Sequence, residues 1–282
     1  MMDKKIIWGL VVFGFLLTGH KVAALLSASQ ADAEQKELEA YLKKANVGAI
    51  LKGAQGGRGE GWTISLHDGK TARKGFFKYV DIRRPTNFPI SYKYELAAYE
   101  LTKLLKINIV PPVVEREIQE STGQKQEPKG QKRKGSLQIY VEGCITERDR
   151  TLKKIDPPNP QAFADALEEI NVLEILTSCD HLSPKDILIH RETWRVCRVD
   201  FAEAFDPSTE FLPEAAIRRC SKRLYKGLLD LSPLDVEATL KPYLNAREIK
   251  GLLDRRNLII EKIKNLIIDK GEAAVLFDLE SK

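Results

Sequence analysis

In the first half of the chain, the spacing of the apolar residues differs from one segment to the next. Each spacing predicts either a helix or a strand. Leu38 and Leu42 stand four apart in a charged segment, as on one side of a solvated amphipathic helix. Apolar and polar residues alternate on both sides of Asp68-Gly69, a dipeptide typical of a β-hairpin turn. Helical spacing returns over residues 92–105. This half therefore predicts a small sheet with helices beside it.

Helical periodicity dominates the second half, which begins after the proline-rich linker at residues 156–160. The expected helices cover residues 161–177, 216–229, 235–240 and 245–268, the last with Asn245 as its N-cap. Two short strands, 187–189 and 194–199, form a hairpin between the first two of these helices. The whole pattern predicts an α+β protein that is β-rich in its N-terminal half and mostly helical in its C-terminal half.

Composition and charge narrow the classes of molecule that the protein is expected to bind. The chain has 282 residues, 43% of them apolar and 30% charged, which is enough for one large domain or two lobes. Its formal net charge is only +5, and the basic segment 119–135 has no aromatic side chains among its lysines. A solvated loop explains that segment better than a nucleic-acid site, so we expect no nucleic-acid partner. The four cysteines have no metal-binding spacing, and the sequence leaves open disulfides and buried thiols.

The N-terminus has the three parts of a secretory signal. Lys4 and Lys5 precede a mostly apolar run at 6–19, and small residues follow. This run is short for a spanning helix, so a cleaved signal peptide is favoured over an uncleaved anchor that extends through Leu26. The lysines before the run place the rest of the chain outside the cytoplasm. We expect an exported protein, periplasmic or extracellular, that contacts the inner membrane only through such an anchor.

A glycine-rich segment precedes the first hairpin. Residues 53–61 include Gly56, Gly57 and Gly59. Glycine lets backbone amides approach an anion closely, as a loop that covers phosphate requires. The segment lacks the Gly-Lys-Ser/Thr ending of a Walker loop, and a flexible turn without a ligand is the other interpretation.

One lysine and one glutamate in the first half are candidates for a charge pair. Lys78 alternates with Phe77 in its strand, so the two side chains point to opposite faces of the sheet. If the face of Lys78 is buried, its ammonium needs a carboxylate or a phosphate, because an unpaired buried charge is costly. Glu95, near the start of the next helix, is the candidate carboxylate. The other interpretation is that both are surface residues.

Three carboxylates gather around the second hairpin. Asp180 follows the helix over 161–177, Asp186 precedes the first strand, and Asp200 follows the second strand. Carboxylates brought together in this way suit hard divalent metals and phosphate oxygens, and they match the layout of a phosphoryl-transfer site. The alternative is that polar residues merely punctuate a hairpin.

Together these motifs resemble the atypical kinase families of protein-kinase-like fold, namely the phosphatidylinositol-kinase-like, HipA-type and secretory-pathway Golgi casein kinase-like families. The nearest resemblance is to a group of secreted bacterial proteins with the motifs Val-Phe-Lys, Tyr-x-x-Glu/Asn-x-Ala-Ala-Tyr-x-Leu, Val-Pro-x-x-Val-Glu-Arg, Asp-Arg-Asn/His-x-Gly-Asn and Ile-Asp. The matching segments here are 76–78, 92–99, 110–116, 180–186 and 199–200.

The resemblance implies a nucleotide, ATP or another, between the two lobes. Lys78 would bind its phosphates, Glu95 would orient Lys78, and Asp180 would be the catalytic-loop carboxylate. Asp186 and Asp200 would hold Mg²⁺ or Mn²⁺. The protein would then be an ATP-dependent phosphotransferase whose acceptor, a protein, lipid or small molecule, and whose oligomeric state are not named by the sequence.

The motifs and the resemblance together predict how the chain is divided into parts. The expected parts are a signal peptide or anchor at 1–33, a lead-in helix at 34–52, an N-lobe at 53–155 with the basic loop 119–135, and a helical C-lobe at 156–282. The strand over 136–141 resembles, by its position, the hinge that contacts the adenine base in kinases.

The loop between Asp180 and Asp186 departs from the family pattern, with one extra residue, no arginine, and Asp186 in place of asparagine. Aspartate is also an oxygen ligand for metal, but the insertion displaces Asp180. Lys185 is a candidate internal counter-charge. The alternative function is therefore a degenerate kinase that serves as a nucleotide- or partner-binding module at the cell envelope. We also expect Asp200 to be the principal metal ligand, and Asp200→Asn to preserve or raise the stability of the apo protein.

Overall fold

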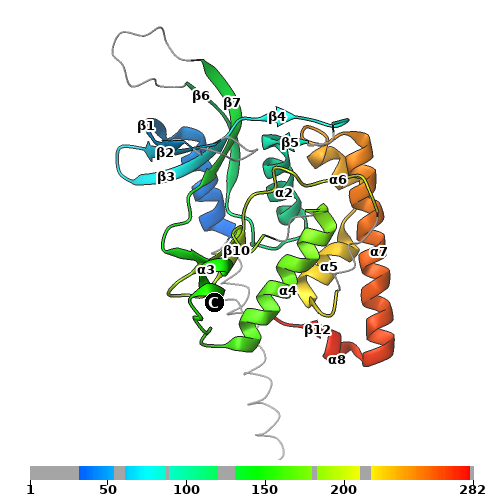
Figure 1. The fold of residues 1–282 in the computed structure, drawn as a ribbon. Helices are drawn as coiled ribbons and strands as arrows, with labels where there is room; N and C mark the ends of the chain where they lie inside the picture. The colour runs from blue at the N-terminus through cyan, green and yellow to red at the C-terminus, as the bar shows by residue number, and fades with distance from the viewer. Residues whose placement is uncertain are drawn as a thin grey trace, which may run out of the picture.

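A computed structural model of the chain describes residues 32–53, 61–86, 89–119, 131–179, 183–209 and 217–279. A β-rich lobe and a helical lobe lie side by side (Figure 1). The two-lobed α+β architecture expected from the sequence is therefore confirmed.

The N-terminal lobe is built on an antiparallel sheet in the order β1-β2-β3-β7-β6. Its strands are β1 (Asn46–Gly53), β2 (Gly61–His67), β3 (Ala72–Lys78), β6 (Val113–Gln119) and β7 (Lys132–Ile139). The predicted hairpin turn joins β2 to β3, where Gly69 has a φ of 92° and the Asp68 carboxylate accepts hydrogen bonds from the amides of Lys70 and Thr71. A positive φ at this position favours glycine.

Two expected boundaries in this lobe differ from the structure. The lead-in helix covers residues 32–44, and residues 46–52 of the expected 34–52 segment belong to β1 instead. Apolar alternation in β1 is weak, which hid it from the sequence analysis. The basic segment is shorter than 119–135, because β6 extends to Gln119 and β7 starts at Lys132.

One face of the sheet is apolar, and the other carries polar side chains. The apolar core of this lobe contains Trp62, Ile64, Leu66, Phe77, Val114, Ile118, Leu137 and Ile139, together with Leu42 from the lead-in helix. Leu38 packs against the same cluster, so the predicted docking of that helix is confirmed. Because side chains alternate along a strand, Lys78 and its cross-strand partner Ser136 occupy the face opposite Phe77.

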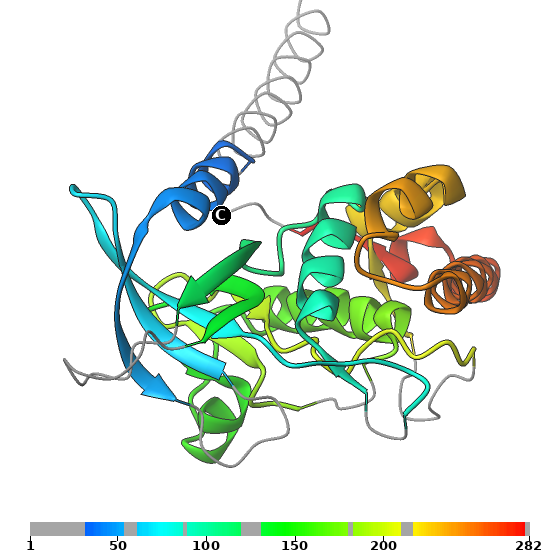
Figure 2. The same cartoon turned by 90° about the horizontal axis from the view of Figure 1, so that it is seen from above.

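Helix α2 (Tyr92–Leu104) lies between the sheet and the C-terminal helices (Figure 2). The chain reaches it through β4 (Asp81–Ile82) and β5 (Ile90–Ser91), which pair with each other. The side chain of Ser91 caps the helix by accepting a hydrogen bond from the amide of Lys93. This cap fixes where the helix begins, and so where Glu95 stands.

The C-terminal lobe is mainly helical, as predicted. Its elements are α3 (Glu147–Leu152), α4 (Pro160–Thr177), α5 (Lys222–Asp230), α6 (Pro233–Leu240), α7 (Ala246–Lys270), α8 (Glu272–Val275), a sheet of β8 (Cys144–Thr146), β9 (Ile187–His190) and β10 (Val196–Arg198), and the parallel pair β11 (Cys220–Ser221) and β12 (Leu276–Phe277). Asn245 caps α7 in a capping box with Glu248, which confirms the predicted N-cap.

Two C-terminal elements begin later than predicted. Helix α5 starts at Lys222 rather than at 216, because β11 pairs with β12 just before it. Strand β10 starts at Val196, because Trp194 adopts a φ of 57° in the preceding turn. Among the described residues, none of the helices has the length and apolar character needed to cross a bilayer, and residues 1–31 of the expected export segment 1–33 lie outside them.

Candidate active site

Lys78 and Glu95 form the pair that the resemblance to kinases implied, on the sheet face that alternation in β3 predicted for Lys78. Lys78 is the last residue of β3, and Glu95 lies in the first turn of α2. The two side chains are buried, with 9% and 3% of their residue surfaces exposed, and Lys78 Nζ lies 2.5 Å from Glu95 Oε1. A buried ammonium needs such a partner, so this contact holds the sheet and the helix in a fixed relation.

Asp200 is a second carboxylate on the same ammonium. Its Oδ1 atom lies 2.6 Å from Lys78 Nζ, while 51% of its side chain remains exposed. Burial alone would lower the pKa of Lys78, but the charges of Glu95 and Asp200 raise it above its usual value. Burial would likewise raise the pKa of Asp200, and the ion pair with Lys78 lowers it instead. Lys78 and Asp200 are therefore both charged at neutral pH.

The pairing of Asp200 contradicts one expectation from the sequence. We expected Asp200→Asn to preserve or raise the stability of the apo protein, because the carboxylate was placed only among other carboxylates. In the structure Asp200 contacts a buried cation, so neutralising it removes a favourable interaction. Asp200 also has a φ of 68°, a left-handed conformation that is uncommon outside glycine and clusters at functional sites.

Asp186 lies beside a buried arginine that the sequence analysis missed. Arg198 is 1% exposed, and its Nε lies 2.6 Å from Glu174 Oε1, while its guanidinium lies 3.7 Å from Asp186 Oδ2. Two signals pointed to this pair. Arg198 alternates in phase with the inward-facing Val196 of β10, and Glu174 interrupts an apolar run in α4. The internal counter-charge is Arg198 rather than Lys185, whose side chain is exposed.

Negative charge exceeds positive charge in this cluster. Two cations face four carboxylates, which leaves a formal charge of −2 among Lys78, Arg198, Glu95, Glu174, Asp186 and Asp200 when all are ionised. Two of these carboxylates, Asp186 and Glu174, have raised pKa values. Burial raises the pKa of Asp186, and the neighbouring Asp200 raises it further. Burial also raises the pKa of Glu174, and Asp186 adds to that effect.

A polar side chain without a partner stands on the same face of the sheet as Lys78. Gln138 of β7 pairs across the strands with Phe76 of β3, two positions along β7 from Ser136. Its Nε2 atom is buried and has no hydrogen-bond partner among the described residues. Buried donors are normally satisfied, so an unsatisfied one suggests a ligand or water.

Several predicted site residues lie outside the described part of the chain. They are Asp180 and the glycines Gly56, Gly57 and Gly59. Within the described ranges, the structure has no group of three or more His, Cys, Asp or Glu side chains arranged to hold a metal. Asp186 and Asp200 remain as a pair of candidate ligands. The four cysteines are free thiols.

No protein-family model matches this chain, and no curated protein matches it. Among solved structures, that of hydra Fam20 with sugar is similar over 88% of this chain and 93% of its own, with a TM-score of 0.60 and 15% identity. The Helicobacter pylori proinflammatory kinase CtkA is similar over 80% of this chain and 97% of its own, with a TM-score of 0.47 and 10% identity. Identities this low show the fold alone. The chain has the atypical protein-kinase-like fold that its motifs implied.

Proposed function

We propose that this protein is a phosphotransferase that binds ATP with a divalent cation, Mg²⁺ or Mn²⁺, between its two lobes. The observation that carries the proposal is the charge excess at the site. Four carboxylates surround two cations, and one of the carboxylates, Asp200, is half exposed. Mutual repulsion of this kind favours the binding of a cation, and a nucleotide bound through that cation would place its phosphates near Lys78.

The residues present fit such a complex. Lys78 would keep Glu95 as its buried partner and exchange its contact with the exposed Asp200 for phosphate oxygens. Asp200 and Asp186 would then be free to hold the cation, which would supply the positive charge that stabilises the transferring phosphoryl group. Arg198 would stay with Glu174 and keep Asp186 in place.

The unsatisfied amide of Gln138 supports a base-binding role for β7. A carboxamide both donates and accepts hydrogen bonds, so it matches the adjacent amino group and ring nitrogen of adenine. Gln138 lies within the strand that resembles the kinase hinge by position, and on the sheet face of Lys78. The base would therefore lie beside β7, with the phosphates nearer to Lys78.

Thermal unfolding with and without ATP and Mn²⁺ or Mg²⁺ tests the proposal. Ligand at a hundred times its dissociation constant adds about 2.7 kcal/mol to the free energy of unfolding. We expect a shift that requires both ATP and the cation. No shift at saturating concentrations of both would contradict nucleotide binding.

A transfer assay with labelled ATP separates the phosphotransferase from the alternative, a binding module without turnover. Asp200→Ala is the matched negative control, because it removes the exposed carboxylate of the proposed cation site. We expect the wild type to transfer label to itself, to water or to a supplied acceptor, and Asp200→Ala to transfer none. A cation-dependent thermal shift without any transfer would favour the module.

A further inference from the structure

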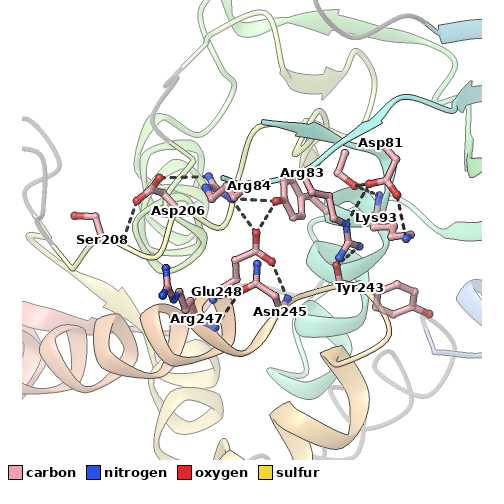
Figure 3. Close-up of polar contacts among 12 residues, drawn as sticks. Asp81, Arg83, Arg84, Lys93, Asp206, Ser208, Tyr243, Asn245, Arg247 and Glu248 are labelled. Carbon is pink, nitrogen blue, oxygen red and sulfur yellow. Dashed lines mark hydrogen bonds and ion pairs between the residues drawn. The ribbon is translucent and has the colours of Figure 1, made fainter. Parts of the chain in front are cut away.

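One buried carboxylate joins three elements at the junction of the lobes. Glu248 of α7 is fully buried, and its Oε2 accepts a hydrogen bond from the amide of Asn245 at 2.8 Å. Its Oε1 accepts from the hydroxyl of Tyr94 on α2 at 2.6 Å and from the guanidinium of Arg84 at 3.1 Å. Figure 3 shows Arg84 and Asn245 beside the carboxylate of Glu248. Such a group is costly to bury unless every partner is in place.

Arg84 connects this carboxylate to the segment that follows Asp200. Arg84 lies between β4 and β5, and its guanidinium lies 3.4 Å from Asp206 Oδ2 (Figure 3). It also donates to the hydroxyl of Tyr94 and lies over that ring, 5.6 Å from the centroid. Arg84 therefore links the entry to α2, helix α7 and the chain just beyond the cation site.

The same contacts lead directly to the two carboxylates of Lys78. Tyr94 is the neighbour of Glu95 in α2, and its ring packs on Phe205 with centroids 5.9 Å apart. A backbone hydrogen bond of 2.8 Å joins the amide of Ser91, the N-cap of α2, to the carbonyl of Ala202. The position of Glu95 and the path of the chain after Asp200 are thus set by one network.

We propose that Arg84, Tyr94 and Glu248 form an inter-lobe clamp that positions Glu95 and Asp200 around Lys78. This inference rests on the proposed function, because the clamp would act through the site where nucleotide and cation bind. The three residues do not contact Lys78 in the structure, so they are positioning residues rather than catalytic ones. Without the clamp, α2 and the segment 200–206 would be free to move relative to each other, and the two carboxylates would no longer be held on one ammonium.

Two variants open the clamp by different amounts. Glu248→Gln removes the charge that faces Arg84, yet glutamine at this position still completes a capping box with Asn245. Arg84→Met removes the bridge to Glu248 and Asp206 and keeps much of the side-chain volume. Arg223→Met is the control, because it removes the arginine, 42% exposed, that lies 2.5 Å from another buried carboxylate, Glu169, inside the C-terminal lobe.

The first measurement is hydrogen exchange of the apo proteins. We expect both clamp variants to exchange faster in α2 and in residues 200–206, with α4 unchanged, whereas Arg223→Met should change α4 and α5 instead. Equal exchange in α2 and 200–206 for the wild type and both clamp variants would overturn the clamp. This readout needs no ligand, so it decides the question even if the proposed function is wrong.

The second measurement is the affinity of each protein for ATP with Mn²⁺, which the thermal shift reports. We expect Arg84→Met to weaken the affinity about tenfold, Glu248→Gln to weaken it less, and Arg223→Met to leave it unchanged. If the wild type binds and both clamp variants bind equally well, the clamp is only a stabilising contact and the proposal is overturned. If the wild type itself does not bind, the proposed function fails, and the exchange experiment alone decides the clamp.

Discussion

Two ion clusters in this protein, each built on a buried carboxylate, differ in charge balance. In the C-terminal lobe, Glu169 is 1% exposed and accepts hydrogen bonds from Ser221 Oγ at 2.5 Å and from Arg223 Nε at 2.9 Å. One carboxylate meets one cation and one hydroxyl there. At the junction of the lobes, Lys78 meets two carboxylates, and one of them, Asp200, is half exposed.

The difference separates an ion pair that holds a fold from one that can change partners. In the Glu169 cluster the charges are balanced, although the Arg223 side chain is 42% exposed, so the cluster has no excess charge for an external ion to neutralise, and it fixes α4 against β11 and α5. The Lys78 cluster has excess negative charge and is exposed on the side of Asp200, so a cation at Asp200 would be favourable, and Lys78 would then be able to bind an anion. A comparison of variants in the two clusters therefore tests the proposed site against ordinary structural ion pairs.

The largest expected effect comes from Lys78→Met. This change leaves Glu95 buried without a cation, and breaking a buried pair in this way costs about 3–5 kcal/mol of unfolding free energy. We expect a large loss of stability in urea denaturation, together with the complete loss of the shift caused by ATP and Mn²⁺.

Arg223→Met, which leaves Glu169 without its guanidinium, provides the comparison for that experiment. It should lose less stability than Lys78→Met, because the Arg223 side chain is 42% exposed, and it should keep the nucleotide shift. If Arg223→Met lost the shift as well, general destabilisation would explain both results, and Lys78 would no longer be distinguished from a structural residue.

Asp200→Asn has the next largest effect on binding and a smaller effect on the fold. Lys78 keeps Glu95 in this variant, and the lost pair is half exposed, so the apo protein should lose about 1 kcal/mol or less. The shift caused by ATP and Mn²⁺ should disappear, because asparagine removes the exposed charge on which the cation would bind. A variant that melts far below the wild type, yet still binds ATP with Mn²⁺, would make Asp200 a structural residue.

The sequence predicted the part of this site that depends on local periodicity. Alternation in β3 placed Lys78 opposite Phe77, helical spacing placed Glu95 at the start of α2, and the resemblance to kinases implied their pairing without a structure. The partner of Asp200 was not, because Lys78 and Asp200 are 122 positions apart and only the packing of the two lobes brings them together.

The same limit explains what the sequence analysis missed elsewhere. Arg198 and Glu174 look like isolated charges in apolar elements until β10 packs beside α4, and the bridge from Arg84 to Glu248 spans 164 positions. Short elements such as β11 and β12 have no periodicity of their own and exist only as a pair. Local signals therefore gave the lobes and the main helices, while the charge balance of the site required tertiary structure.

The smallest expected effect is a change in the pH dependence of stability when Glu174 is replaced. Burial raises the pKa of Glu174 above its usual 4.5, despite the ion pair with Arg198. The folded protein then binds this proton more tightly than the unfolded chain does, so the contribution of Glu174 to the unfolding free energy falls as pH rises from 4.5 through the raised pKa. Glu174→Gln cannot titrate, and its stability should fall less than that of the wild type over the same interval. Urea denaturation at several values between about pH 4 and pH 7 measures the difference. Parallel curves for the two proteins would mean that the folded protein binds the proton of Glu174 no more tightly than the unfolded chain does, which would contradict the raised pKa.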